Sequence, residues 1–397
     1  MEENLFVEQR IVSPRRFERS TKEPVAISVL DSGAGAEFFL TAESPADLDL
    51  AASWKAIESS YREALSNIGL DLDTEVFVRL HVSDALNQIA RLRERISKRG
   101  GGLVSIIGQP PVQRNKIALE AYHVKGRHPC RRHYSSEGQL VLEHGNYQMI
   151  WGSFHARANG AADAQTTDLL RQLEETAAGQ GCSLGKDLLR TWFFVRDIDT
   201  NYAGLVQARR ELFERWGLTS ATHYVASTGI AGEMQHHEEL VTMDALLERG
   251  LDARQIRFMT AESHLCPTHR YGVTFERGTG VVYGDRTHYF ISGTASIDKD
   301  GQILHDGDFD KQVERTVENI GVLLAEQGAH LSDLKQAIVY LRDPSEGARA
   351  RRLLASLLPE SVPLVMVEGR VCRPGWLIEI EAIAGTARGD ASFADYF

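Results

Sequence analysis

The chain has 397 residues, of which 43% are hydrophobic and 25% are charged, and these fractions exclude a disordered, collagenous or fibrous protein. Acidic residues outnumber basic ones by 55 to 44, so the net charge is −11 and the chain as a whole does not attract nucleic acid or an anionic membrane. No apolar run reaches the roughly 18 residues of a membrane span, and the N-terminal residues MEENLFVEQR lack a signal-peptide pattern, so we expect a cytoplasmic protein.

Three segments follow the same order of elements: an amphipathic helix, a glycine, a polar stretch and an apolar strand that ends in aspartate. Apolar residues recur at steps of three and four in each helix, so each helix has one buried face. The glycine lies where a helix C-cap favours a residue that tolerates positive φ. The segments are 54–84, 169–197 and 313–343, and the glycines are Gly69, Gly181 and Gly328.

A second helix and a closing strand complete each segment. Second helices are expected over 85–98, 202–216 and 346–358, and a hairpin precedes the first helix, most clearly in 281–304. Each unit therefore reads β-β-α-β-α-β, an α+β arrangement in which two helices cover one face of a mixed sheet. The closing strands KIALEAYHV, LVTMDALL and LIEIEAIA align with an acid at one shared position, namely Glu120, Asp244 and Glu381.

The repeats divide the chain into three units followed by a tail. Polar linkers are expected at 128–136 and 249–268, and the tail is predicted to be loosely ordered. The boundaries are 1–127 for unit 1, 128–250 for unit 2, 251–385 for unit 3 and 386–397 for the tail.

The third unit resembles the reactive-intermediate deaminase (Rid, YjgF-like) superfamily in the sequences ISGTASID, 305–343 and LIEIEAIA. Members of this superfamily are small trimers of chorismate-mutase-like units, with ligand clefts between the subunits. The resemblance therefore implies that the three units form an intrachain pseudo-trimer in which unit 1 is architectural. It also implies a monomer or a weak homo-oligomer.

Within the superfamily, the sequence is most similar to chorismatases, which cleave chorismate and release pyruvate without a metal or cofactor. The ligand would then be a small-molecule carboxylate, and the ring product 3-hydroxybenzoate, which we favour, or a dihydroxycyclohexadiene carboxylate. The chain departs from chorismatases after ISGTASI, where DKDGQIL replaces a Gly- and His-rich turn. The similar motifs are ISGTASI (291–297), HDGD (305–308), VCR (371–373), ASTGIAG (226–232), ARRELFERWG (208–217) and CPTHRYGVTFERG (266–278).

Glu379 is the candidate general acid. Side chains alternate along a strand, so Glu379 and Glu381 of IEIEAI point to the same face. At the Glu379 position the other units have Ala118 and Thr242, so the acid breaks the internal symmetry at one cleft. Glu379 matches the catalytic carboxylate of the superfamily, and a buried carboxyl that keeps its proton can protonate the vinyl carbon of an enol ether. The alternative interpretation is a surface glutamate.

Cys372 lies seven residues before Glu379 and matches a cysteine of the hydroxybenzoate-forming chorismatases. It is therefore a candidate product-determining residue, and the alternative interpretation is a buried cysteine that acts as a small hydrophobe. The four cysteines, Cys130, Cys182, Cys266 and Cys372, form no CxxC pair, so we expect neither a disulfide framework nor a zinc site.

Chorismate is a dicarboxylate, so an acidic protein must bind it with locally placed arginines. Arg277 of TFERG is the best candidate because it matches a motif position. Arg209 and Arg215 on the 202–216 helix are further candidates, and we expect Arg209 and Arg210 on different helix faces because adjacent positions diverge by about 100°. The remaining substrate-binding candidates come from the similar motifs and their flanks: Tyr224, Ser227, Thr228, Gly293 and Ala295.

Two other functions remain open. Rid-type deaminases, which hydrolyse enamines and imines, carry an arginine two residues after a proline ahead of the closing strand. Here Pro363 is followed by Leu364 and Val365, so the arginine is missing and deamination is disfavoured. The third hypothesis is a pseudo-trimer that binds a ligand without turnover.

Overall fold

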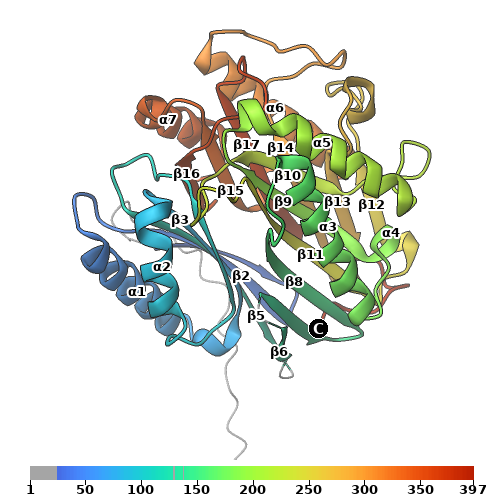
Figure 1. Ribbon diagram of the computed structural model, residues 1–397. Coiled ribbons are helices and arrows are strands. Elements are labelled where there is room, and N and C mark those ends of the chain that lie inside the picture. The colour runs from blue at the N-terminus through green and yellow to red at the C-terminus, as the bar shows by residue number, and fades with distance from the viewer. Residues whose placement is uncertain (1–24, 128–129, 137) are drawn as a thin grey trace, which may run out of the picture.

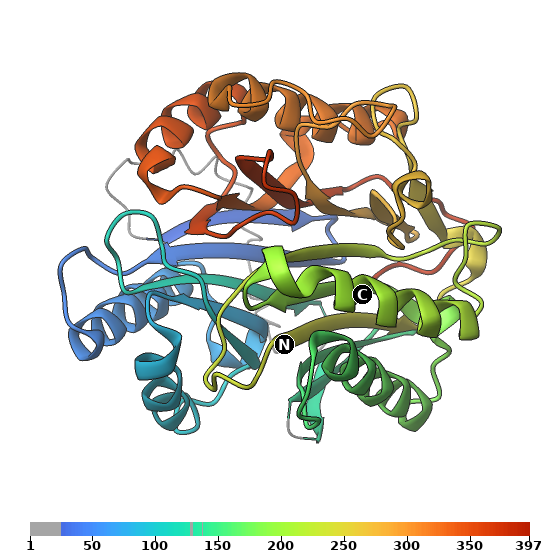
Figure 2. The same ribbon diagram turned by 45° about the horizontal axis from the view of Figure 1, so that its top comes forward.

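The computed structural model describes residues 25–127, 130–136 and 138–397, so the first 24 residues of unit 1 and part of the first linker lie outside the described residues. Three similar α+β units follow one another along the chain (Figure 1). Each unit has one mixed sheet, and its helices lie on the outside of the molecule while the three sheets face one another inside (Figure 2).

Unit 1 builds its sheet in the order β1-β2-β5-β3-β4, with two helices on its outer face. α1 buries Ile57, Tyr61 and Leu65 at steps of four, and α2 buries Ile89 and Leu92 at a step of three, as the helical spacing predicts. The elements are β1 (Val25–Asp31), β2 (Gly35–Glu43), α1 (Leu50–Asn67), β3 (Glu75–Val82), α2 (Ala85–Ile96), β4 (Leu103–Gly108) and β5 (Ile117–Gly126).

Unit 2 repeats this order and extends its sheet by one strand, giving β10-β9-β11-β8-β7-β6. The elements are β6 (Arg131–Ser136), β7 (Gln139–His144), β8 (Tyr147–His155), α3 (Ala162–Gly179), the short α4 (Leu184–Asp187), β9 (Leu188–Val195), α5 (Ile198–Arg215), β10 (Ala226–Ala231) and β11 (Val241–Arg249).

Unit 3 has the sheet order β12-β13-β14-β17-β15-β16. Its elements are β12 (Ile256–Met259), β13 (Gly278–Val282), β14 (Thr287–Thr294), α6 (Phe309–Glu326), β15 (Leu334–Leu341), α7 (Gly347–Leu357), β16 (Leu364–Glu368) and β17 (Ile378–Thr386). Short 3-10 helices connect elements at Leu72–Thr74, Ala253–Gln255, Thr268–Tyr271, Leu331–Asp333 and Pro344–Glu346.

The strand registers confirm that the units are equivalent. In each unit the closing strand pairs antiparallel with the strand that precedes the repeated aspartate. The aligned acid of the closing strand lies opposite the residue five positions before that aspartate. The three pairs are Glu120 with Arg79, Asp244 with Trp192, and Glu381 with Ile338. The repeat therefore extends to individual residues.

Each unit also contains a short strand that the sequence pattern did not predict. It follows the second helix and pairs in parallel with the strand that follows the first helix: β4 pairs with β3, β10 with β9 and β16 with β15. Each of these strands contacts the next unit, β4 against β8, β10 against β14, and β16 against β2. These contacts close the ring of three units, so the fold is an intrachain pseudo-trimer.

The inner faces of the sheets share one interior. Phe77, Trp151 and Trp192 stack in sequence, with ring centroids 4.2 and 5.6 Å apart. The buried Arg79 guanidinium joins two units, because it binds Glu120 at 2.5 Å and Asp244 at 2.9 Å. The aligned acids therefore point inward, where they pair with cations at the junction of the units.

Two predicted irregular segments are ordered. Residues 131–136 of the first linker form the edge strand β6, and the second linker contains β12. The tail, expected to be loose, is also packed: Tyr396 is fully buried, and its hydroxyl lies 2.8 Å from that of Tyr122. His144 contacts the Tyr396 carbonyl oxygen at 2.6 Å. The apolar end of the tail packs where the three units meet and stabilises their junction. The composition of the tail did not reveal this packing.

Within the described residues, no helix is long and apolar enough to cross a membrane.

Candidate active site

A cavity of about 370 Å³ lies between units 2 and 3. Helix α5 and strand β10 form its unit 2 side, and β14, β17 and two loops form its unit 3 side. Its volume falls within the range of small-ligand sites. Of the predicted site residues, it is lined by Glu379, Cys372, Arg277, Arg209, Ser227, Gly293 and Ala295.

Glu379 reaches the cavity from β17, where it lies opposite Tyr340 of β15. It is only 5% exposed. The pairing of β14 with β17 is interrupted between Ile291 and Thr294, and this bulge brings the Gly293 backbone against the carboxyl group. A Cβ atom at Gly293 would lie 2.8 Å from the Glu379 carboxyl carbon, so a side chain at this position would displace the acid.

Burial raises the pKa of Glu379 to about 8, and the nearby charge of Glu381 contributes to the increase. The positive charges of Arg190 and Arg277 act in the opposite direction but do not outweigh burial. Among the described residues, no side chain donates a hydrogen bond to this carboxyl group. Glu379 therefore carries its proton at neutral pH and faces the cavity, as a general acid requires.

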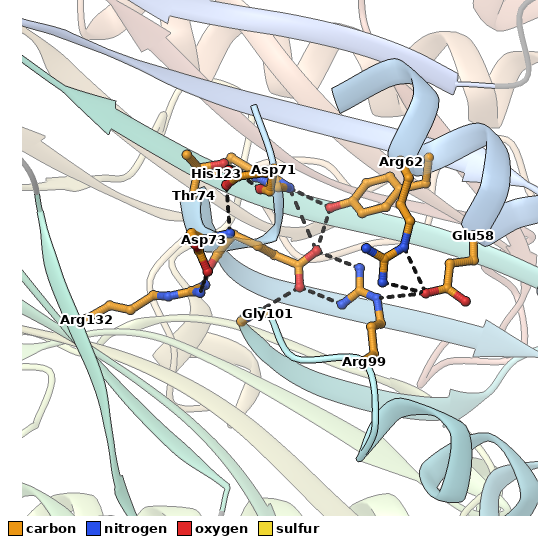
Figure 3. Close-up of polar contacts among 12 residues, drawn as sticks. Glu58, Arg62, Asp71, Asp73, Thr74, Arg99, Gly101, His123 and Arg132 are labelled. Atoms are coloured by element: carbon orange, nitrogen blue, oxygen red, sulfur yellow. Dashed lines mark hydrogen bonds and ion pairs between the residues drawn. The ribbon is translucent and has the colours of Figure 1, made fainter. Parts of the chain in front are cut away.

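Glu75 shows the opposite way of burying a carboxylate (Figure 3). Arg99 donates two hydrogen bonds of 2.7 Å to it, and Tyr61 donates another at 2.8 Å. Although burial alone would raise its pKa, Arg99 holds the pKa of Glu75 below its usual value. Glu75 is thus an ionised structural group, and the comparison shows that burial by itself does not create an acid catalyst.

Glu381 lies on the same face as Glu379 but points into the central interior. Its carboxylate accepts hydrogen bonds from Arg190 at 2.9 Å and from the Trp192 indole at 3.0 Å. It therefore belongs with Glu120 and Asp244 in the ionic framework of the pseudo-trimer. Of these two acids of β17, it is Glu379 that reaches the cavity between units 2 and 3.

Arg209 is a buried cation with neutral partners. Its side chain donates to the hydroxyls of Thr274 at 3.0 Å and Ser227 at 3.3 Å. Its Nη2 atom is buried and has no hydrogen-bond partner among the described residues. Burial lowers the pKa of this guanidinium, so a carboxylate in the cavity would supply the charge and acceptor that the fold does not.

Arg277 precedes β13 and lies in the wall of the cavity. It donates two hydrogen bonds to the carbonyl oxygen of Cys266, the shorter at 2.7 Å. Its guanidinium also lies 5.4 Å from the centroid of Tyr271 and 5.5 Å from that of Phe275. Like Arg209, it has no acidic partner within the described chain.

Ser227 and Thr228 support these groups from β10. The Thr228 hydroxyl accepts hydrogen bonds from Arg190 at 2.7 Å and from the Gly293 amide at 3.0 Å. It thereby fixes the bulge that adjoins Glu379, although it does not line the cavity. Ala295 is 4% exposed and lines the cavity close to the bulge.

The thiol of Cys372 also lines the cavity. Burial, followed by the nearby Glu379, raises its pKa to about 12, and Tyr202 only partly opposes this increase. The thiol is therefore neutral at physiological pH. Because the thiolate is the nucleophilic form of cysteine, Cys372 can affect a reaction here by its size and polarity but not as a ready nucleophile.

Besides Thr228, two further candidates lie outside the cavity. Arg215 is exposed in the last turn of α5, about one and a half turns beyond Arg210, where the helix last reaches the cavity. Tyr224 is half-buried and does not line the cavity, but its backbone amide donates to Glu276 at 2.7 Å. The motif that contains Arg215 extends past the cleft, so proximity in sequence was misleading.

The structure adds cavity residues that the sequence analysis did not select. Tyr202 and Val206 lie on the same face of α5 as the predicted Arg209, at the helical spacing of four and three, a signal that was present in the sequence. Arg209 is buried and Arg210 is exposed, so the two adjacent residues lie on different faces of α5 as expected, but Arg210 also lines the cavity because its long side chain reaches Gly272. The loop residues are Tyr271, Phe275, Arg373 and Trp376.

No group of three or more histidine, cysteine or acidic side chains in the described chain is arranged to hold a metal ion.

Comparison with known proteins agrees with this architecture. The family model described as endoribonuclease L-PSP matches residues 280–386. Over 96 residues the chain is 36% identical to a RutC family protein of Pyrococcus abyssi and 28% identical to the 3-aminoacrylate deaminase RutC of Acinetobacter baylyi. Each match covers 24% of this chain and 76% of the relative.

A crystal structure of a chorismatase is similar over nearly the whole molecule. It has a TM-score of 0.61 at 20% identity and covers 90% of this chain and 100% of the other. The fold is therefore a chorismatase-like tandem of three Rid-like units. On the sequence match, the chain belongs to the RutC family within the Rid (YjgF-like) superfamily.

Proposed function

We propose that this protein is a chorismatase-type enzyme, which cleaves the enolpyruvyl ether of chorismate or a close relative. The observation that carries the proposal is Glu379, a buried carboxyl group with a pKa of about 8 that opens into a cavity with several arginines. An enol ether needs a proton on carbon, and chorismate needs cations for two carboxylates. This cavity offers both in a protein whose net charge is −11.

The reaction begins when Glu379 donates its proton to the terminal carbon of the vinyl group. The former double bond becomes an oxocarbenium ion between the ether oxygen and the neighbouring carbon. Arg277 lies near enough for its charge to act on Glu379, and it would hold the carboxylate beside the reacting carbon. Arg209 would bind the substrate as a second buried cation.

The oxocarbenium ion can react further in two ways, and both balance in atoms and charge. In hydrolysis, one water adds to the oxocarbenium carbon, the hemiketal collapses to pyruvate, and the ring leaves as a dihydroxycyclohexadiene carboxylate. In the internal route no water is consumed: the oxygen of the neighbouring C4 hydroxyl attacks C3 and gives up its proton as the C3–ether bond breaks and pyruvate leaves, and the resulting epoxide opens at C4 with loss of the C3 proton to its own oxygen, which gives 3-hydroxybenzoate. Both routes return a proton to Glu379.

We favour the internal route to 3-hydroxybenzoate, because Cys372 lines the cavity close enough to Glu379 for the two groups to interact. A neutral, weakly polar thiol at this place does not hold an attacking water as a hydrogen-bonding side chain would. The cavity is lined by units 2 and 3 of one chain, and we propose that the protein acts as a monomer whose unit 1 completes the ring.

The test is incubation of the full chain with chorismate, with pyruvate measured by lactate dehydrogenase coupling and ring products by chromatography. Glu379→Gln should abolish pyruvate release, whereas Glu214→Gln on the exposed face of α5 should leave it unchanged. Absence of pyruvate with the wild type would refute the proposal, and undiminished turnover in Glu379→Gln would refute the assignment of the acid.

The same preparation tests the other two functions. Val365, at the position of the deaminase arginine, is fully buried in β16, so enamine hydrolysis has no matching carboxylate anchor there. Release of ammonia from 2-aminoacrylate generated in the assay would support a deaminase instead. Tight binding of chorismate without any product would support a binding protein.

A further inference from the structure

Besides the exposed Arg210, which donates to the carbonyl oxygen of Gly272, three guanidinium groups line the cavity without being neutralised by the fold. Within the described chain, Arg209, Arg277 and Arg373 form no ion pair. The polar partners of Arg209 are hydroxyl groups, and Arg277 and Arg373 each donate to a backbone carbonyl oxygen. Buried charge without a counter-charge is costly, so this cavity is arranged to receive negative charge.

Aromatic rings separate the three cations. Arg373 lies 4.9 Å from the centroid of Trp376 and 4.8 Å from that of Tyr271, and Arg277 contacts the same Tyr271 ring at 5.4 Å. Phe275 in turn lies between Arg277, at 5.5 Å, and Arg209, at 5.9 Å. These contacts hold each guanidinium in a fixed position beside its neighbour. A small ring ligand next to Tyr271 can therefore meet two cations at once.

Arg373 differs from the other two in its position and support. It is half-buried, whereas Arg209 and Arg277 are 1% and 4% exposed, so it lies nearer to the solvent side of the cavity. Its Nη1 atom donates to the carbonyl oxygen of Gly301 at 3.0 Å. Gly301 belongs to DKDGQIL, the turn at which this sequence departs from the chorismatases that it resembles.

The turn is itself well defined. The Asp298 carboxylate accepts hydrogen bonds from the amides of Asp300 at 2.9 Å and Gln302 at 2.8 Å. Gly301 has a φ of +82°, and a Cβ atom there would lie 3.7 Å from the ring of Tyr271. The turn therefore holds Arg373 and packs against the ring that Arg373 contacts.

We propose that Arg373, seated by this turn and by Tyr271, is a specificity-determining residue that makes the cavity select dicarboxylates over monocarboxylates. Arg277 acts on Glu379 and faces the carboxylate beside the reacting carbon, and Arg373 binds the second carboxylate, the one on the ring. The inference rests on the proposed function for its choice of ligand, but it concerns binding and not turnover.

The test uses two stable ligands and calorimetry on the full chain. The diacid 3-(carboxymethoxy)benzoate has a ring carboxylate and an ether-borne carboxylate but no vinyl group to protonate, and phenoxyacetate keeps only the ether-borne carboxylate. The wild type should bind the diacid at least about tenfold more tightly. Arg373→Met should weaken diacid binding by about ten- to hundredfold and change phenoxyacetate binding by less than about twofold.

Three further variants separate this role from a structural one. Arg270→Met removes an exposed arginine next to Tyr271, in the 3-10 helix Thr268–Tyr271, and should leave both affinities unchanged. Arg373→Lys, which keeps the charge, should restore part of the preference for the diacid. Tyr271→Leu should reduce the preference, and Tyr271→Phe, which keeps the ring, should retain it.

Several results would overturn the inference: no preference for the diacid in the wild type, a preference that survives Arg373→Met, or an equal loss for both ligands in that variant. Failure of the proposed function is distinguishable. A chain that releases no pyruvate from chorismate, yet loses its diacid preference in Arg373→Met, would refute the reaction and support this inference.

Discussion

Replacing Glu379 by glutamine should stabilise the fold, and the gain should grow with pH. Burial raises the pKa of Glu379 from 4.5 to about 8, so the folded chain keeps a proton that the unfolded chain releases. The stabilisation from that proton is complete below pH 4.5 and is lost as the pH rises through 8. Each pH unit in this interval corresponds to about 1.4 kcal/mol, and glutamine has no such dependence.

Between pH 5.5 and 7.5 the wild type should therefore lose about 2.5 kcal/mol of unfolding free energy relative to Glu379→Gln. The assay is urea unfolding followed by tryptophan fluorescence at pH 5.5, 6.5 and 7.5, with the two proteins compared at each pH so that other titrating groups cancel. Glu214→Gln, an exposed substitution of the same kind, should give a difference that does not vary with pH. A constant difference for Glu379→Gln would refute a protonated Glu379 in the folded chain.

The remaining predictions concern turnover, the cations and the tail. The kcat/KM for chorismate should fall about tenfold from pH 7 to pH 9, because the protonated fraction of a group with a pKa of about 8 falls from about nine-tenths to about one-tenth over that range; a flat profile would contradict Glu379 as the acid. Arg209→Met should raise KM at least about tenfold while leaving the melting temperature unchanged or higher, because it removes a buried cation without an acidic partner; a large loss of stability would show that Arg209 is structural. Tyr396→Ala should destabilise the chain by about 3–5 kcal/mol, since its ring is fully buried where the units meet, and thermal unfolding that matches the wild type would show that the tail is dispensable.

The pseudo-trimer explains how one cleft of the chain can differ from the equivalent positions in the other units. Each unit contacts the next through equivalent strands, but the position of Glu379 is occupied by Ala118 in unit 1 and by Thr242 in unit 2. Ala118 has no polar side chain, and the Thr242 hydroxyl donates to the carbonyl oxygen of Phe154 at 2.6 Å. Tandem fusion of the units lets each cleft change separately, which a trimer of identical chains does not allow.

The position of the candidate acid could be predicted from the sequence. Strand alternation placed Glu379 and Glu381 on one face, and comparison of the repeats separated the shared acid from the unshared one. The sequence could not show that Glu381 is paired with Arg190 and Trp192 while Glu379 is left facing a cavity. That difference depends on side chains from another unit.

Periodicity determined the elements, the repeat and the buried face of each helix, because hydrophobic spacing is a local property that the chain carries in its order of residues. Only the tertiary structure decided which buried faces meet. Tyr271 and Arg373 lie in loops without periodicity, Arg215 belongs to a matching motif but turns away, and Tyr396 closes a junction about 250 residues away in sequence, at His144. These placements follow from the packing of three units around one interior, which no single segment of the sequence specifies.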